Sequence, residues 1–207
     1  MKYTSLTALS LTLLALTPVT PAFAASQSFD FKDPKGVNNV VFKLDAPLEA
    51  ISGSASGISG TISFDPEQPA ATRGKLTVTT ASLTVPNSVM KDHMLGAQWL
   101  DVAKHPEIIF EASELKNTKV SGDTVTGEAH GKLTLKGVTK EITAPVKLTL
   151  LKDKLGQRVP NLKGDLLVLR STFTIKRTDF GINPGAPQDK VSDEIELTLA
   201  VAGAAPR

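Results

Sequence analysis

The stretch VTGEAHGKLTLKGVTKEITAPVKLTL, residues 125–150, decides the fold of this chain. From Val125 to Leu135, apolar or small residues alternate with polar ones, and the alternation resumes between Val138 and Leu150. One face of each segment is therefore apolar and the other polar. This period of two is typical of antiparallel strands with one buried and one solvated face. The stretch predicts two long strands.

The same pattern recurs on both sides of this stretch. Residues 191–201 repeat it at length, and further matches lie at 40–45, 58–64, 74–81, 107–113 and 162–175. Several of these eight segments exceed ten residues, which suits the tilted strands of a barrel, and barrel closure also removes edge strands. We predict an all-β fold, an eight-stranded antiparallel barrel, with a β-sandwich as the alternative.

One short helix and one long loop interrupt the strand pattern. Pro86-Asn87-Ser88 offers a helix cap, residues 89–95 the helix, and Gly96 a stop. Residues 179–190 contain two glycines and two prolines, which is typical of a loop.

The N-terminus has the features of a secretory signal peptide. Lys2 supplies a positive start, residues 5–16 an apolar run, and Ala22-Phe23-Ala24 a cleavage site. A membrane anchor is the alternative, but the run is shorter than the ~20 residues of a spanning helix. We expect a signal peptide at 1–24, cleavage after Ala24, one domain over 25–207 with no membrane-spanning segment, and a periplasmic or secreted location.

Composition excludes several classes of partner. Lys and Arg number 23 against 21 Asp and Glu, so the formal net charge of +2 argues against a nucleic-acid partner. There is no cysteine, which excludes disulfides, thiolate metal sites and thiol nucleophiles.

The remaining polar residues suggest neither a metal site nor a catalytic one. His93, His105 and His130 lie at no ligand spacing from one another. Asp92 and His93 are adjacent on the predicted helix and cannot face each other, and no nucleophile motif accompanies them. We expect no metal, no cofactor and no enzymatic activity.

Met90 and Met94 lie four residues apart on one face of the predicted helix, and Trp99 follows. They suit gap-filling in a core. They equally suit an adaptable apolar wall for a ligand, since thioether side chains conform to irregular shapes.

Three charged residues fall on apolar faces. Arg177 and Asp179 lie an even number of residues from Ile175, and Asp193 lies two residues from Ile195. In a strand, residues spaced in this way point to the same face. Such charges are costly unless paired, so we expect Arg177 to pair with a carboxylate inside the barrel or at its rim. The alternative is that Arg177 meets the polar head group of a ligand.

Three blocks of sequence resemble a known family. They are SVMKDHMLGAQWLDVAKHPEIIFEAS (88–113), TGEAHGKLTLKGVTKEIT (126–143) and FTIKRTDFGINPGAPQDKVSDEIELTL (173–199), with GTISFDPEQP (60–69) as a weaker fourth. In order and spacing they are similar to the YceI-like, polyisoprenoid-binding, lipocalin-like proteins of bacteria. The resemblance implies a lipocalin-like barrel of eight antiparallel strands with a helix at one side. It also implies an elongated apolar cavity that holds a polyprenyl compound, a quinone or a fatty-acid derivative.

We expect inward residues to form the wall of such a cavity, with Arg177 as the head-group contact. These wall residues are Phe42, Leu76, Val78, Met90, Met94, Trp99, Phe110, Leu133, Leu135, Val146, Phe173, Ile175 and Ile195. The chain departs from the resemblance at Ala55 and Ile58, where relatives tend to have aromatic residues, and at Trp99-Leu100, where paired phenylalanines are usual. The identity of the lipid therefore stays open.

The sequence favours an exported, non-catalytic protein that holds a long-chain lipid for carriage or sequestration. The alternative is a periplasmic, stress-related interaction protein whose barrel is filled by side chains. A lipid-modifying enzyme is a third hypothesis, for which the sequence supplies no convincing nucleophile. Homodimerisation is left open.

Overall fold

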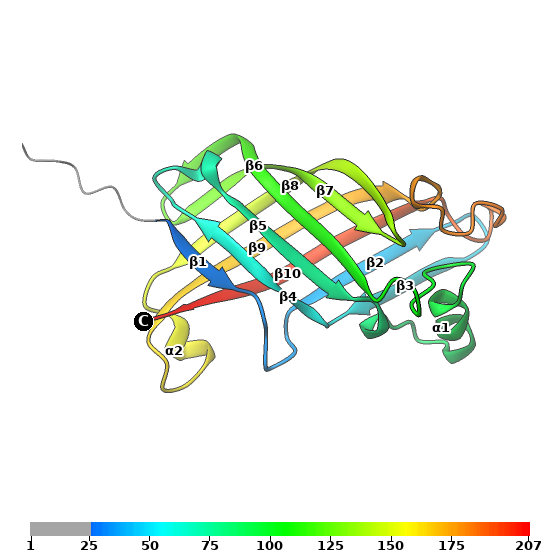
Figure 1. Ribbon diagram of the computed structural model, residues 1–207, viewed down its shortest axis with the longest axis horizontal. Coiled ribbons are helices and arrows are strands. Elements are labelled where there is room, and N and C mark those ends of the chain that lie inside the picture. The colour runs from blue at the N-terminus through cyan, green and yellow to red at the C-terminus, as the bar shows by residue number, and fades with distance from the viewer. Residues whose placement is uncertain (1–25) are drawn as a thin grey trace, which may run out of the picture.

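Long antiparallel strands dominate the computed structural model, which describes residues 26–207 (Figure 1). The expected signal peptide lies outside the described residues. The strands are β1 (Gln27–Asp30), β2 (Asn39–Asp45), β3 (Ala50–Ala55), β4 (Ile58–Phe64), β5 (Arg73–Thr79), β6 (Glu107–Ser121), β7 (Thr124–Leu135), β8 (Val138–Leu151), β9 (Gly164–Lys176) and β10 (Glu194–Pro206). The helices are α1 (Ser88–Leu95) and α2 (Leu155–Arg158), with single 3₁₀ turns η1 (Pro69–Ala71), η2 (Thr80–Ser82) and η3 (Thr178–Phe180).

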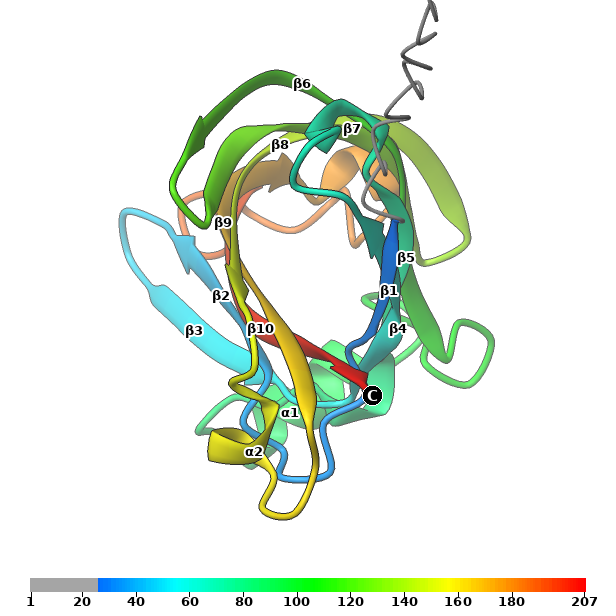
Figure 2. The ribbon, with the colours of Figure 1, turned by 90° about the vertical axis from the view of Figure 1, so that its left-hand side faces the viewer.

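Eight of these strands close into a ring. The order runs β1-β4-β5-β6-β7-β8-β9-β10, and β1 returns to β10 where Asp30 pairs with Ala204. The remaining two strands, β2 and β3, form a hairpin that continues the sheet from β10. Figure 2 shows the ring end-on, with this hairpin at its side. The predicted antiparallel barrel of eight strands is confirmed, and the sandwich alternative is wrong.

The identity of one ring strand differs from the prediction. The segment at 40–45 was expected in the barrel, but as β2 it pairs with β10 and β3, whereas the short β1 completes the ring between β4 and β10. Strand β1 has only four residues, which are too few to show a period of two.

The stretch at 125–150 forms the hairpin β7–β8, as predicted. Its register runs from Thr124 opposite Thr149 to Leu135 opposite Val138. Lys136 and Gly137 form the turn, and both have positive φ values, 49° and 75°. Two such residues match the right-handed twist of a two-residue hairpin.

The interior divides into two apolar clusters. The cluster toward the chain termini includes the fully buried Phe29, Phe31 and Phe64. The cluster toward α1 includes Phe42 and Leu83, with Met90, Met94 and Trp99 packed against it as partly buried residues.

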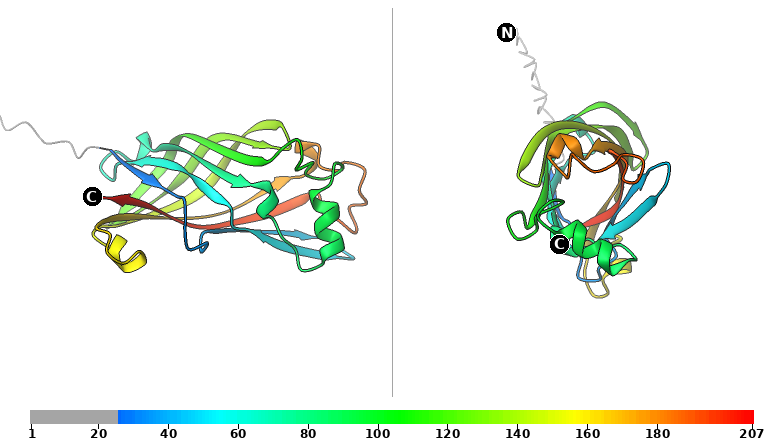
Figure 3. Two further views of the ribbon diagram at one scale, coloured as in Figure 1. Left: turned by 60° about the horizontal axis from the view of Figure 1, so that its bottom comes forward. Right: turned by 90° about the vertical axis from the view of Figure 1, so that its right-hand side faces the viewer.

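Helix α1 lies across one end of the barrel (Figure 3). The Asn87 side chain accepts a hydrogen bond of 2.9 Å from the Met90 backbone N–H, which satisfies one of the free donors of the first turn. Gly96 follows the last helical residue, so the predicted helix is confirmed with a start one residue earlier. The predicted loop at 179–190 is confirmed except for residues 179–180, which belong to η3, and turns follow from Gly181.

Within residues 26–207, no helix is long and apolar enough to cross a membrane.

Candidate functional site

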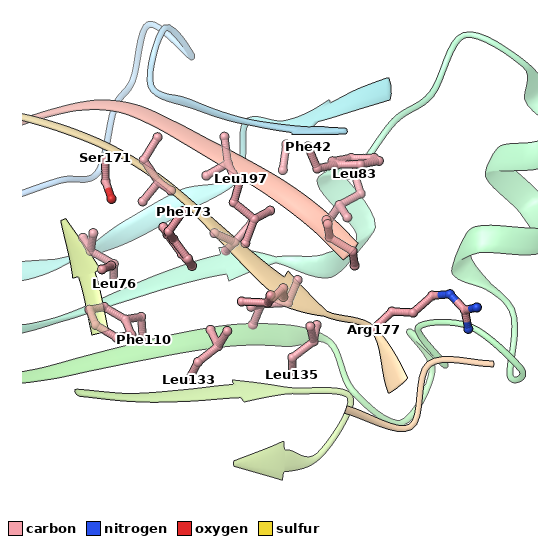
Figure 4. A pocket seen from close by; sticks show the side chains of 18 of the residues that line it. Phe42, Leu76, Leu83, Phe110, Leu133, Leu135, Ser171, Phe173, Arg177 and Leu197 are labelled. Atoms are coloured by element: carbon pink, nitrogen blue, oxygen red, sulfur yellow. The ribbon is translucent and has the colours of Figure 1, made fainter. Parts of the chain in front are cut away.

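A cavity of about 550 Å³ runs into the barrel from the end that α1 covers, and residues of both apolar clusters line it. Its wall draws on β2 to β10, on α1 and on the loops beside it. Figure 4 shows Leu76, Phe110, Leu133 and Phe173 directed into this space from four different strands. Inward residues of a barrel alternate with outward ones, so each long strand contributes a row of side chains to the lining.

All fourteen residues expected at the site line this cavity. They are Phe42, Leu76, Val78, Met90, Met94, Trp99, Phe110, Leu133, Leu135, Val146, Phe173, Ile175, Arg177 and Ile195. That they contact a ligand stays a prediction.

Sequence reasoning missed two kinds of lining residue. Leu148, Leu197 and Leu199 share strand parity with expected residues, so the same alternation could have included them. Leu83 and Ile182 lie in loops. They line the cavity because the chain returns to it there, and a loop has no alternating pattern that would predict this.

Of the forty lining residues, six are polar or charged: Glu49, Thr72, Asn87, His93, Ser171 and Arg177. Two of these hydroxyls are already used within the protein. The Ser171 Oγ donates to the Pro145 carbonyl at 2.7 Å, and the Thr72 Oγ1 donates to the Pro69 carbonyl at 2.7 Å. The deep part of the cavity therefore presents hydrocarbon to a ligand.

The cavity meets solvent beside α1. Its exposed lining residues are Glu49, Asn87, Val89 and His93, which define the mouth of the cavity. The barrel wall is incomplete here, since an isolated bridge between Ser54 and Thr84 is the pairing that joins β3 to the segment before α1.

Apolar side chains stand beside the mouth. Val89 on α1 is 62% exposed, and Leu48 in the turn between β2 and β3 is 65% exposed. The backbone N–H of Leu48 donates to the Asp189 carbonyl at 2.8 Å, which ties this turn to the loop that follows η3. The mouth therefore has a partly apolar rim.

Arg177 is held in a way that the sequence did not predict. Its guanidinium donates to the backbone carbonyls of Ser192, Ile182, Asn183, Ala186 and Val191, at distances up to 3.4 Å. The residue is 0% exposed, and its guanidinium carbon lies 5.9 Å from the centroid of the Trp99 ring, within cation–π range. Figure 4 shows the side chain pointing away from the apolar lining.

The expected pairing of Arg177 with a carboxylate is therefore wrong. Asp193 instead accepts hydrogen bonds from the Thr178 backbone N–H at 3.0 Å and from the Thr178 hydroxyl at 2.9 Å. Arginine has five N–H donors, and carbonyls of the 182–192 segment occupy all five. A head group can reach Arg177 only if one of these bonds is released.

Lys136 secures the same end of the barrel. Its Nζ donates to the Gln98 and Gly181 carbonyls, each at 2.9 Å. Burial lowers the pKa of Lys136 below its ordinary value. Lys136 and Arg177 thus tie the loops around Trp99 and after η3 to the barrel.

The three histidines do not converge. His93 lies at the mouth, His105 packs against Gly137, and His130 lies on the outer face of β7 with its Nε2 4.0 Å from a Glu128 oxygen. Among the described residues, no cluster of three potential metal ligands is found.

Comparison with known proteins agrees with this architecture. A family model described as a YceI-like domain matches residues 29–202. A UPF0312 protein from Pseudomonas paraeruginosa is 31% identical over 197 residues, covering 93% of this chain and 96% of the relative.

Two solved structures share the fold. A polyisoprenoid binding domain from Saccharophagus degradans superposes with a TM-score of 0.64 at 13% identity, covering 87% of this chain and 99% of that one. The YceI protein of Campylobacter jejuni superposes with a TM-score of 0.62 at 23% identity, covering 75% and 85%. Because the family model matches most of this chain, the chain belongs to the YceI-like family.

Proposed function

We propose that this protein binds a long-chain isoprenoid or other lipid in its barrel cavity, for carriage or sequestration, and catalyses no reaction. The cavity itself carries the proposal, because it is large, apolar in its deep part and open at one end. The S. degradans neighbour, described as a polyisoprenoid binding domain, supports a ligand of this class.

The driving force for such binding is the removal of hydrocarbon from water. Each methylene that enters an apolar site is stabilised by about 0.8 kcal/mol. At about 30 Å³ for a water-sized group, the cavity accommodates roughly 18 such groups. A methylene is of similar size, so a long alkyl or prenyl tail has both the room and the driving force to enter.

The distribution of polar groups orients the ligand. A polar head buried in the deep part would lose its hydrogen bonds to water and find no free partner there. Asn87 and His93 at the mouth retain polar atoms that face solvent. We infer that the tail points inward and that the head group remains at the mouth, so that the thirteen apolar wall residues contact the tail while Arg177 holds the loop.

Binding without catalysis fits the chemistry of the lining. A hydroxyl nucleophile needs an adjacent base, but the Ser171 hydroxyl donates to a backbone carbonyl among apolar neighbours. Glu49 and His93 lie at the exposed mouth, where water competes for every hydrogen bond.

A barrel interior filled by side chains was the alternative hypothesis. The cavity argues against it, because a filled core would leave no continuous space of this size.

The proposed location is outside the cytoplasmic membrane, after cleavage behind Ala24. The features of residues 1–24 support this proposal. Sequencing the N-terminus of the exported protein is expected to give Ala25 first, and an intact Met1 on the exported protein would contradict it.

Lipid binding can be followed through Trp99, because it is the single tryptophan of the chain and lines the cavity. Geranylgeraniol added to the detergent-free protein should change Trp99 fluorescence in a saturable manner. Ala144→Phe, which fills the cavity, should weaken this response at least tenfold in Kd.

Thr143→Phe provides the matched control. Ala144 lines the cavity, whereas Thr143 precedes it on β8 and its hydroxyl lies 3.4 Å from Nδ1 of His130 on the outer face. This control should bind as the unmodified protein does. Equal binding by both variants, or no saturable response from the unmodified protein, would count against the proposal.

A further inference from the structure

The cavity ends at a common level on several strands. Its deepest lining residues are Ile62 on β4, Leu148 on β8, Leu169 on β9 and Leu199 on β10. The next inward residues toward the chain termini are Phe64, Leu150, Leu167 and Val201, which are buried but do not line the cavity. The cavity therefore ends at this level, where packed side chains close the barrel interior.

Phe29 on β1, Phe31 just after β1 and Phe64 at the end of β4 supply the aromatic part of this layer. Phe29 and Phe31 are both 0% exposed and belong to the same apolar cluster as Phe64. We call Phe29, Phe31, Phe64, Leu150, Leu167 and Val201 the floor of the cavity.

The backbone around Phe31 is fixed on both sides. Its N–H donates to the Gly60 carbonyl at 2.9 Å, and its carbonyl accepts from the Asn38 side chain at 3.0 Å. Its ring lies over Gly203, where a Cβ would come within 2.6 Å of the ring. Because a close-packed interior of this kind yields little, a ligand tail should stop at the floor.

The region behind the floor offers no continuation for a hydrocarbon tail. A separate small hollow there is lined by Phe29, Phe64 and Leu150 together with charged Glu67, Lys152 and Asp165. Asp165 is also engaged by Arg207 at 2.8 Å. A tail that passed the floor would therefore meet charged groups rather than apolar wall.

We propose that the floor, and Phe31 in particular, sets the maximum length of the tail that the protein buries. The proposal rests on the proposed lipid-binding function and adds a selectivity to it. Tails up to the depth of the cavity gain affinity with each added methylene, whereas longer tails leave their excess outside the mouth and gain nothing more.

The test is a chain-length series of saturated primary alcohols, titrated against the detergent-free protein with Trp99 fluorescence as the readout. For the unmodified protein, Kd should fall roughly fourfold per added methylene and then become constant. The chain length at which Kd stops falling is the quantity to compare among variants.

We call the chain length at which Kd stops falling the break. Two variants should move this break in opposite directions. Phe31→Ala removes a ring from the floor and should shift the break to longer alcohols. Ala129 is the deepest lining residue of β7. Ala129→Leu places a larger side chain at the inner end of the cavity, which shortens it, and should shift the break to shorter alcohols.

Phe110→Ala is the matched control, because Phe110 lines the side of the cavity and not its end. It should weaken binding of every alcohol and leave the break unchanged. Should Phe31→Ala fail to fold, Ala129→Leu alone decides the matter.

The outcomes separate this proposal from the one on which it rests. If the unmodified protein binds none of the alcohols and no prenol, the lipid-binding function itself is wrong, and the floor with it. If it binds them with a clear break that neither variant moves, or with no break at all, lipid binding stands and the role of the floor is overturned.

Discussion

Arg177 shows how a buried charge can serve structure without a counter-ion. Its five donors meet five carbonyls of the 182–192 segment, so a single side chain organises a loop that has no strand or helix of its own. Hydrogen bonds that involve a charged donor contribute more than neutral ones, and buried carbonyls without a donor are costly.

We expect Arg177→Met to lower the free energy of unfolding by about 3 kcal/mol, because it leaves the carbonyls without donors. Urea unfolding measures this loss, and hydrogen exchange should show faster exchange across 182–192. If Arg177 instead serves mainly as a head-group contact, the variant will lose lipid affinity while keeping its stability.

Asp33 carries a second buried charge, and its effect depends on pH. Burial raises the pKa of its carboxyl, but hydrogen bonds from the backbone N–H groups of Asn38, Lys35 and Val37, together with the charge of Arg158, outweigh it and lower the pKa below the ordinary 3.8. A lowered pKa in the folded state stabilises the fold above pH 3.8, and this stabilisation is lost as the pH falls through the folded value.

Asp33→Asn should therefore cost about 2 kcal/mol of unfolding free energy at pH 7, and less at pH values below 3.8. Chemical unfolding of both proteins at pH 7 and at a pH below 3.8 measures the two costs. Asp179→Asn, at an exposed carboxylate on η3, is the control and should change little. A cost at Asp33 that is equal at both pH values would contradict the electrostatic explanation.

At the scale of elements, the gap between β3 and α1 is the feature that connects the cavity to solvent. One isolated bridge closes the wall at Thr84, and the exposed lining residues lie beyond it. A ligand entering here passes Val89 on the exposed face of α1.

Because the chain has no cysteine, a bulky maleimide can be attached at one chosen position. Labelled Val89→Cys should slow lipid uptake at least tenfold, while labelled Val120→Cys should not. Val120 is exposed to a similar degree, 57%, and lies on the β6–β7 hairpin away from the cavity. Stopped-flow Trp99 fluorescence gives both rates, and equal rates would place the entrance elsewhere.

Alternation along the chain predicted the long elements, and the reason is physical. Strands such as β7 and β8 bury one face and expose the other. Alternate residues point to opposite faces, so apolar and polar residues must alternate along each strand. Strand β1 and strand β3 escaped the prediction, since one has four residues and the other, AISGSA, consists largely of small residues.

At the scale of the whole molecule, one barrel holds a hollow part toward α1 and a filled part toward the chain termini. Strand parity identifies which residues face inward but not whether they touch one another across the interior. That distinction depends on where the rings of Phe29, Phe31 and Phe64 lie, and these residues come from β1, from the residue that follows it and from β4. The fold and the wall were therefore predictable from the sequence, whereas the floor, the mouth and the carbonyl shell of Arg177 required the three-dimensional path of the chain.

Native mass spectrometry of the protein, exported in its host and purified without detergent, tests the central claim most directly. The protein should carry an additional mass of one lipid, which solvent extraction removes and the Ala144→Phe variant lacks. A single mass equal to the polypeptide alone, for a folded protein that also takes up no added prenol, would contradict the proposal that this barrel holds a lipid.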